Sequence, residues 1–347
     1  MNKENPIMKK RLLTLIAVLS LLVVFTAIRV MAAPKDEKET KVPEWKCEEV
    51  NDPSAPVVYF TKDISPEGLV RAYKALGWTP QGKVGVKIST GESAKTNHLR
   101  PAFIKDLVQM VNGTIVECNT AYGGSRASNA LHHQVVKDRG YLDIAKFDLL
   151  DEEGYMTLPV NRKVLKEDYV GSHFKNYGSY LVLSHFKGHQ MGGFGGALKN
   201  LSIGFGSGTS SKKSGKAIIH SGGKSTTDPW CGDQIPFLEA MGEAAVAVCM
   251  AMENGKNIAF VNVMNRLSVD CDCNGNPAEP DMHDIGILAS LDPLALDQAC
   301  IDKVWQAPDS KSLKARVERQ QGRHILDYVQ TFGVYKRNYR LVNLDEK

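Results

Sequence analysis

A glycine-rich segment, residues 185–200, concentrates side chains that could carry out chemistry. It reads His-Phe-Lys-Gly-His-Gln-Met-Gly-Gly-Phe-Gly-Gly-Ala-Leu-Lys-Asn. Histidine titrates near neutral pH and can move a proton, and a lysine ammonium can neutralise charge on a substrate. We therefore predict that His189 and Lys199 are catalytic; an ordinary flexible loop is the alternative. Glycine lets a backbone approach a ligand closely, so the predicted substrate contacts here are Gly195, Gly196 and Asn200.

A second segment, Asn97-His98-Leu99-Arg100-Pro101, precedes a helix start. A guanidinium binds carboxylates and phosphates through two parallel hydrogen bonds, and the free amides of a helix start also favour anions. We expect Arg100 to hold an acidic substrate, with His98 beside it; a surface ion pair of Arg100 is the alternative. Residues 119–126 follow another apolar run, so the three segments are expected to converge in one cleft.

Two closely spaced cysteines, Cys271 and Cys273, stand in a segment that also carries His283. Thiolate, imidazole and carboxylate ligands suit a borderline metal such as zinc or iron. The spacing is not that of a zinc ribbon, and a turn held by Asp and Asn side chains is the alternative. The predicted metal ligands are Cys271, Cys273 and His283, joined by the His185/His189 pair in a non-catalytic metal-binding protein.

Apolar runs and helical patterns alternate along the chain, which is typical of βαβ units. Ser65 before Pro66, and Pro101, favour helix starts. The predicted strands are residues 57–60, 83–88, 113–118, 180–184, 217–220 and 257–264. The predicted helices are residues 66–76, 101–111, 127–139 and 236–254, the last closed by Gly255. The fold class is therefore α/β, with a mixed or mostly parallel sheet, covering helices and two lobes around a cleft.

Residues 1–33 resemble an export signal: Lys9-Lys10-Arg11 precede an uncharged stretch that ends in small residues. We predict a signal peptide or an uncleaved anchor there, a linker at 34–56, an N-terminal α/β lobe at 57–160 and a second lobe at 161–347. The second lobe carries the glycine-rich His/Lys loop and the Cys-x-Cys loop. The protein is expected to be exported, periplasmic or extracytoplasmic, and to touch a membrane only through its N-terminal segment.

Charge and cysteine content limit the classes of function. Residues 1–33 hold five of the 43 basic residues and one of the 39 acidic residues, so 38 of each sign remain. A neutral body does not favour nucleic-acid binding, and a small-molecule ligand or substrate is expected instead. The seven cysteines are an odd number, so at least one has no intrachain disulfide partner.

These motifs resemble those of the family known as domain of unknown function 362, from about residue 57 to residue 304. The similarity rests on the Asn97–Pro101 turn, Lys187-Gly188-His189 with Gly196-Ala197-Leu198-Lys199-Asn200, and Asp270-Cys271-Asp272-Cys273 followed by residues 284–293. Many members contain a ferredoxin-like insertion with four closely spaced cysteines. This chain lacks that pattern, so we do not expect an iron–sulfur cluster.

A more distant resemblance is to the lactate racemase family, whose members use a nickel cofactor tethered to a lysine. Residues 97–101 are similar to that family's Asp-x-Thr-Arg-Pro, and the stretch from His189 to Lys199 is similar to its His, Gly-Phe-Ser-Gly-Gly and Lys. The resemblance implies a proton-transferring base at His189, a tether at Lys199, a carboxylate contact at Arg100 and a metal ligand at His220. Zinc, iron and nickel are thus the candidate divalent ions.

Two classes of function follow from these residues. One is a metal- or cofactor-dependent isomerase or oxidoreductase that moves a proton or hydride on a small organic acid. The other is a non-catalytic metal-binding or redox-partner protein that uses Cys271 and Cys273. A receptor for a small ligand is a third possibility.

Overall fold

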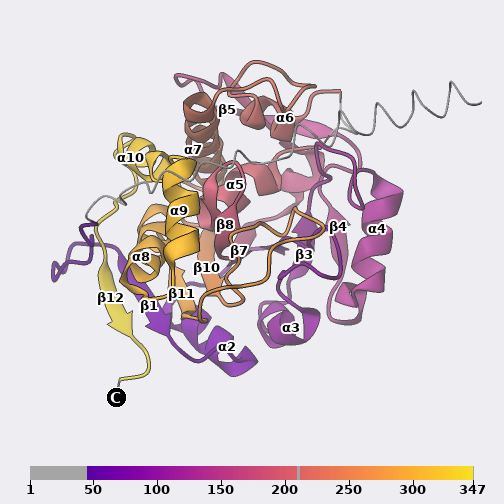
Figure 1. Ribbon diagram of the computed structural model, residues 1–347. Helices are drawn as coiled ribbons and strands as arrows, with labels where there is room; N and C mark the ends of the chain where they lie inside the picture. Colours follow the sequence, from indigo (N-terminus) through magenta and orange to yellow (C-terminus); the bar gives the residue numbers. More distant parts are fainter. Residues whose placement is uncertain (1–44, 209–211, 347) are drawn as a thin grey trace, which may run out of the picture. The chain divides into compact units, whose positions relative to one another are not determined.

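An eight-stranded sheet forms the centre of the protein (Figure 1), in the order β12-β1-β11-β10-β7-β2-β3-β4. The computed structural model describes residues 45–208 and 212–346. The strands of the sheet are β1 (Val57–Thr61), β2 (Val84–Lys87), β3 (Thr114–Glu117), β4 (Phe147–Leu149), β7 (Ser179–His185), β10 (Ile258–Met264), β11 (Gly286–Ser290) and β12 (Arg340–Asn343). Within it, β11 runs antiparallel to both neighbours, and every other pairing is parallel. The predicted α/β class with a mostly parallel sheet is therefore confirmed.

Two small hairpins and a set of helices complete the fold. The hairpins pair β5 (Tyr155–Pro159) with β6 (Glu167–Gly171) and β8 (Lys187–His189) with β9 (Gly193–Gly195). The helices are α2 (Pro66–Ala75), α3 (Pro101–Met110), α4 (Asn129–Asp138), α5 (Ala197–Phe205), α6 (Gly215–His220), α7 (Gln234–Ala251), α8 (Pro293–Gln306), α9 (Lys311–Arg319) and α10 (His324–Gln330), with 3-10 turns η1 (Tyr141–Asp143) and η2 (Ser172–Asn176).

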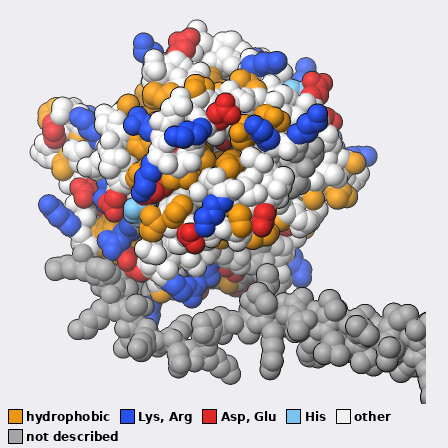
Figure 2. Space-filling model, turned by 90° about the horizontal axis from the view of Figure 1, so that it is seen from above, with side chains coloured by type: hydrophobic (Ala, Val, Ile, Leu, Met, Phe, Trp, Pro, Cys, Tyr) orange, Lys and Arg blue, Asp and Glu red, His pale blue; other side chains and the backbone are white. Residues whose placement is uncertain are grey.

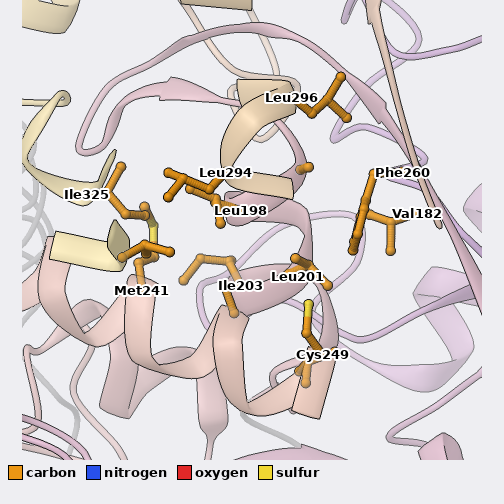
Figure 3. Packing of buried hydrophobic residues seen from close by; sticks show 14 of the residues in the cluster. Val182, Leu198, Leu201, Ile203, Met241, Cys249, Phe260, Leu294, Leu296 and Ile325 are labelled. Atoms are coloured by element: carbon orange, nitrogen blue, oxygen red, sulfur yellow. The ribbon is translucent and has the colours of Figure 1, made fainter. Parts of the chain in front are cut away.

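Alternating side chains of the strands build one apolar core on each face of the sheet. Leu181 and Leu183 of β7 pack with α2 and α3, whereas Tyr180 and Val182 face the other side. The helices on that other side include α5, α7 and α8. Figure 3 shows this second core, with labelled side chains from the sheet (Val182, Phe260), α5 (Leu198, Leu201, Ile203), α7 (Met241, Cys249), α8 (Leu294, Leu296) and α10 (Ile325).

Local signals in the sequence set several helix ends. The Ser65 side chain accepts a hydrogen bond from the Gly68 amide at the start of α2, with Pro66 in the first turn, as predicted. Helix α7 ends at Ala251, and Gly255 then takes a left-handed conformation with φ of 84°. Such a residue commonly ends a helix because glycine has no Cβ to clash.

Helix α7 is, among the described residues, a helix long and apolar enough to cross a membrane by length and composition alone. Its apolar window is 67% buried inside the protein, and buried residues occur around its circumference. A helix that is apolar all round and covered by other elements belongs to a core.

On the surface, Figure 2 shows basic and acidic side chains interspersed with apolar ones over one face.

One expectation about local structure is wrong. Residues 217–220 form the end of helix α6, not a strand, because the Ser214 side chain accepts a hydrogen bond from the Ala217 amide and caps a helix start. The linker at 34–56 remains a prediction, although its described part contacts the rest of the protein: the Trp45 Nε1 donates to Asp302 at 2.6 Å, and the Glu48 amide donates to the same carboxylate at 3.0 Å.

The described residues from Trp45 onward belong to one compact unit. The predicted division into lobes at 57–160 and 161–347 remains a prediction, although strands from both stretches share the central sheet. The predicted signal peptide or anchor at 1–33 and the first part of the linker lie outside the described residues.

Candidate functional site

Three neighbouring parallel strands end in polar side chains at one edge of the sheet. Lys87 is the last residue of β2, Glu117 the last of β3 and His185 the last of β7. These residues line a cavity of about 70 Å³, enough for a few water molecules or a small organic anion. Ligands of open α/β sheets bind at this edge, which agrees with the location predicted for the His/Lys loop.

The glycine-rich segment forms the β8–β9 hairpin and then helix α5, which places Lys199 in the first turn of that helix. A distant carboxylate fixes the helix start: Asp297 accepts hydrogen bonds from the Ala197 and Leu198 amides at 2.8 and 2.9 Å. Gly196 is required here, because a Cβ at this position would lie 2.3 Å from Asp297 Oδ1. Burial raises the pKa of Asp297 to about 6.

Gly188 brings the Cys-x-Cys loop onto the hairpin. A Cβ on Gly188 would lie 2.2 Å from the Val269 carbonyl oxygen, and the Gly188 amide donates to the Ser268 carbonyl at 2.8 Å. This close approach of two backbones is possible only without a side chain. It carries Cys271 and Cys273 to His189.

Among the described residues, the side chains of His189, Cys271 and Cys273 form a group that could hold a metal ion. Their ligand atoms lie within 4.8 Å of one another. The Cys273 Sγ lies 3.9 Å from His189 Nε2. The Lys199 ammonium donates to Cys271 Sγ at 3.4 Å. The predicted catalytic pair and the two predicted cysteine ligands therefore occupy one site.

Neighbouring charges favour a thiolate at Cys271. A hydrogen bond from Cys273 lowers the pKa of Cys271 well below its usual value, and Lys199, Lys187 and His189 lower it further against the effect of burial. Burial alone would lower the pKa of Lys199, but the two cysteines raise it. Burial lowers the pKa of His189 and favours its neutral ring. These shifts favour a thiolate at Cys271, an ammonium at Lys199 and a neutral imidazole at His189.

The cavity wall is strongly cationic. Among the described residues that line it, five are basic and one is a carboxylate: Lys87, Arg126, Lys187, Lys199, Lys216 and Glu117. Burial lowers the pKa of Lys87 to about 7 and also lowers the pKa of Lys216. Asn200, one of the predicted substrate contacts, also lines the cavity and accepts from Lys87 Nζ at 3.0 Å. Gly196 lines it as well, and a Cβ on Gly195 would lie 3.5 Å from the Lys199 side chain.

Arg126 is held rigidly in this wall. Its guanidinium donates to Glu117 Oε1 at 2.6 Å and to Glu92 Oε2 at 3.1 Å. Burial alone would raise the pKa of Glu117, but Arg126 and His132 hold it well below its usual range. A buried, fully paired carboxylate of this kind fixes the position of the arginine beside the cavity.

His220 and Trp230 lie near each other beside the cavity. The His220 Nδ1 donates to the Lys216 carbonyl at 2.7 Å, which leaves the lone pair of the neutral ring on Nε2. Burial lowers the pKa of His220 to about 3. His220 lines the cavity but is outside the His/Cys/Cys group, so its role as a metal ligand remains a prediction. Trp230 is 60% exposed, and its ring lies 6.1 Å from the His220 ring and 6.5 Å from the Tyr122 ring.

The predicted anion site at Arg100 is not part of this cavity. The Arg100 guanidinium donates to the Thr96 carbonyl at 2.8 Å and lies 2.7 Å from His98 Nε2. Neither Arg100 nor His98 is among the described residues that line the cavity. Burial, together with Arg100, lowers the pKa of His98 to about 3. The two residues support a loop, and Arg126 occupies the wall instead.

Two other predicted metal ligands, His185 and His283, lie outside the His/Cys/Cys group. His185 has both ring nitrogens engaged, Nδ1 with Asp272 Oδ2 at 2.9 Å and Nε2 with the Asn265 carbonyl at 2.7 Å, so no lone pair remains for a metal. His283 is exposed and pairs with Asp309 at 2.8 Å, outside the His/Cys/Cys group. His185 anchors the cysteine loop on β7, and His283 belongs to the surface.

Several residues of the wall escape prediction from the sequence, namely Lys87, Glu117, Tyr122, Arg126, Lys187 and Lys216. A signal existed for some of them. Lys87 lies at the end of a predicted strand, and Tyr122 and Arg126 lie in the segment 119–126 that was expected to converge on the cleft. No sequence signal pointed to Lys216, because a strand was predicted directly after it.

Fold and cavity together define an α/β protein with a small polar site at the carboxyl ends of its parallel strands. The family described as "Domain of unknown function (DUF362)" matches residues 84–302, and the chain belongs to this family. No curated protein matches the chain.

Two solved structures show partial similarity to this chain. One is the lactate racemase apoprotein from Thermoanaerobacterium thermosaccharolyticum, with 12% identity, a TM-score of 0.41, and coverage of 75% of this chain and 58% of that chain. The other is a structural genomics target from Thermotoga maritima, with 14% identity, a TM-score of 0.39, and coverage of 69% and 58%. This chain thus spans 58% of the length of each. The residue roles implied by the lactate racemase motifs remain predictions.

Proposed function

We propose that the protein is an exported enzyme that binds a small organic acid in the cationic cavity and acts on it with the help of a thiolate-bound metal ion. The observation that carries the proposal is the convergence of His189, Cys271 and Cys273 at a cavity lined by five basic side chains. A cavity of about 70 Å³ is well below the roughly 300 Å³ of a typical cofactor site, which favours proton transfer over hydride transfer from a large cofactor.

Two sulfur donors and one imidazole suit zinc, iron or nickel. Three protein ligands leave a coordination position for a substrate oxygen, as in catalytic zinc sites. The bound metal would act as a Lewis acid that polarises this oxygen.

The chain's own residues supply the remaining functions. Lys199 lies 3.4 Å from Cys271 and can neutralise negative charge that develops on the substrate. Arg126, held by Glu117 and Glu92, is a fixed partner for a carboxylate. The Nε2 lone pair of His220 is free, and because its pKa is lowered to about 3 this nitrogen can accept a hydrogen bond from the substrate rather than hold a proton. His189, as a ligand, would then position the metal rather than move the proton.

Metal content and proton exchange together test this function. Purified protein is expected to bind one equivalent of zinc, iron or nickel, and to exchange deuterium at the carbon next to the carboxylate of at least one acid in a broad panel. Cys271→Ser with Cys273→Ser should abolish both, and Cys231→Ser, which changes an exposed cysteine, should abolish neither. Equal metal content in all three proteins would refute the metal site. Metal uptake without exchange on any acid would refute the enzymatic role.

A second candidate function is that of a dithiol redox partner, and one observation favours it. His189 Nδ1 accepts from the Gly192 amide at 2.8 Å, so in this conformation the ring proton of a neutral His189 lies on Nε2, facing Cys273. With Lys199 at Cys271, the thiolate is then stabilised without a metal. Metal-free protein that loses two mass units on mild oxidation, reversibly and only with both cysteines present, would support this candidate.

A further inference from the structure

Different polar side chains lie next to the two ends of helix α5. Lys199, in its first turn, contacts Cys271. Near its last turn, a Cβ on Gly204 would lie 2.8 Å from Lys87 Nζ, and the Gly206 carbonyl accepts from Lys216 Nζ at 2.5 Å. Because an α-helix rises 1.5 Å per residue, Gly204 lies roughly 7.5 Å along the axis from Lys199. The cavity therefore has two separated groups of polar atoms.

Lys87 and Lys216 keep hydrogen-bonding capacity that residues 45–208 and 212–346 do not use. An ammonium has three donors. Lys216 Nζ donates to Gly206, and Lys87 Nζ donates to the Ile88 carbonyl at 2.6 Å and to Asn200. Lys87 is 1% exposed and Lys216 is 6% exposed, and both line the cavity. Their remaining donors are thus available to a molecule bound there.

Among the described residues, no carboxylate is in direct contact with these two lysines, and Glu117 acts on both at longer range. Lys187 pairs with Asp272 at 3.2 Å, and Arg126 pairs with Glu117 and Glu92. Neither Lys87 nor Lys216 forms an ion pair with any residue of the described ranges 45–208 and 212–346. Buried charges are costly unless they are paired, and burial accordingly lowers the pKa of Lys87 to about 7. An anionic group between the two ammonium groups would remove this cost.

We propose that the natural ligand is a compact dianion, with one acidic group held by Lys87 and Lys216 and the other end directed to Lys199 and the His/Cys/Cys group. This inference rests on the proposed function and names its substrate class. A dicarboxylate and a tetrahedral oxyanion share the required chemistry. A monocarboxylate would leave one of the two groups of donors without a partner.

Binding of simple anions to the zinc-loaded protein tests the proposal. Isothermal titration calorimetry at pH 7 compares malonate, sulfate and acetate with the wild-type protein, K216M, K87M and K212M. Lys212 is exposed, so K212M removes the same charge from outside the cavity and serves as the matched control. Circular dichroism and zinc content establish that each variant is folded and loaded.

We expect malonate or sulfate to bind at least about tenfold more tightly than acetate, since each added charge-assisted hydrogen bond contributes about one order of magnitude. K216M and K87M should each lose this preference while zinc content stays unchanged, and K212M should keep it. Preference for malonate alone identifies a diacid, whereas preference for sulfate identifies a tetrahedral oxyanion.

Two results would overturn the inference: acetate binding as tightly as both dianions, or K212M weakening dianion binding as much as K216M. If K216M does not fold, K87M decides the question alone. Selective binding of a dianion by protein that takes up no zinc would refute the metal site of the proposed function and leave the dianion site standing.

Discussion

The buried carboxylate Asp168 makes stability depend on pH in an unusual direction. Asp168 lies in β6, is fully buried, and neither of its carboxyl oxygens has a hydrogen-bond partner among the described residues. Burial raises its pKa from 3.8 to about 7. Between these two pH values the folded protein binds the proton and the unfolded chain does not, so the free energy of unfolding falls as pH rises from 4 to 7.

The size of this effect follows from the shift. A shift of about three pKa units corresponds to a loss of stability on the order of 4 kcal/mol. The loss is complete above pH 7, and there is none below pH 4. Asp168→Asn has nearly the same shape as the protonated carboxyl and cannot ionise. We expect the variant and the wild-type protein to have similar stability at pH 4.5, and the variant to be more stable at pH 8.

Urea unfolding followed by circular dichroism at several pH values between 4.5 and 8.5 measures the difference. Asp106→Asn, which removes an exposed carboxylate in α3, is the control and should follow the wild-type curve throughout. Parallel curves for Asp168→Asn and wild type would show that the carboxyl is not protonated in the folded protein at pH 7, and the argument from burial would be refuted.

Two further predictions concern the close contact between the backbones at Gly188 and Val269, and the hydrogen bonds that Asp302 accepts from Trp45 and Tyr339. Gly188→Ala should lower zinc affinity at least about tenfold, since its Cβ would displace the cysteine loop at Val269, whereas Gly123→Ala, with nothing within 4 Å, should not. Equal zinc affinity in both would contradict this account. Asp302→Ala removes the partner of Trp45 and of Tyr339 Oη and should destabilise the protein by about 3 kcal/mol in urea unfolding. Asp309→Ala, which removes only exposed contacts with His283, should cost less than about 0.5 kcal/mol.

Local patterns predicted the strands and helices whose signals are local. The runs at 57–60, 83–88 and 257–264 became β1, β2 and β10, because short runs rich in valine, isoleucine and aromatic residues favour strands. The prediction of a strand at 217–220 was wrong because four apolar or aromatic residues fit a helix end equally well. The Ser214 side chain caps a helix start here, which favours the helix.

The candidate site shows where local patterns stop being informative. His189 and Lys199 were predictable because their types and glycine-rich setting are visible within one segment. The start of α5 was not, since it depends on Asp297, about a hundred residues away. Arg100 and Arg126 both lie near a predicted helix start, and only the tertiary structure shows that Arg126 faces the cavity.

Trp230 offers a practical way to observe this site. Its indole is largely open to solvent and neighbours His220 and Tyr122, both of which line the cavity. Trp230 is one of four tryptophans in the chain, so its intrinsic fluorescence contributes to the signal. Occupation of the cavity should therefore change the emission of the unlabelled protein, and Trp230→Phe identifies the part of the change that comes from this residue. The native chain thus contains its own optical reporter for ligand screening.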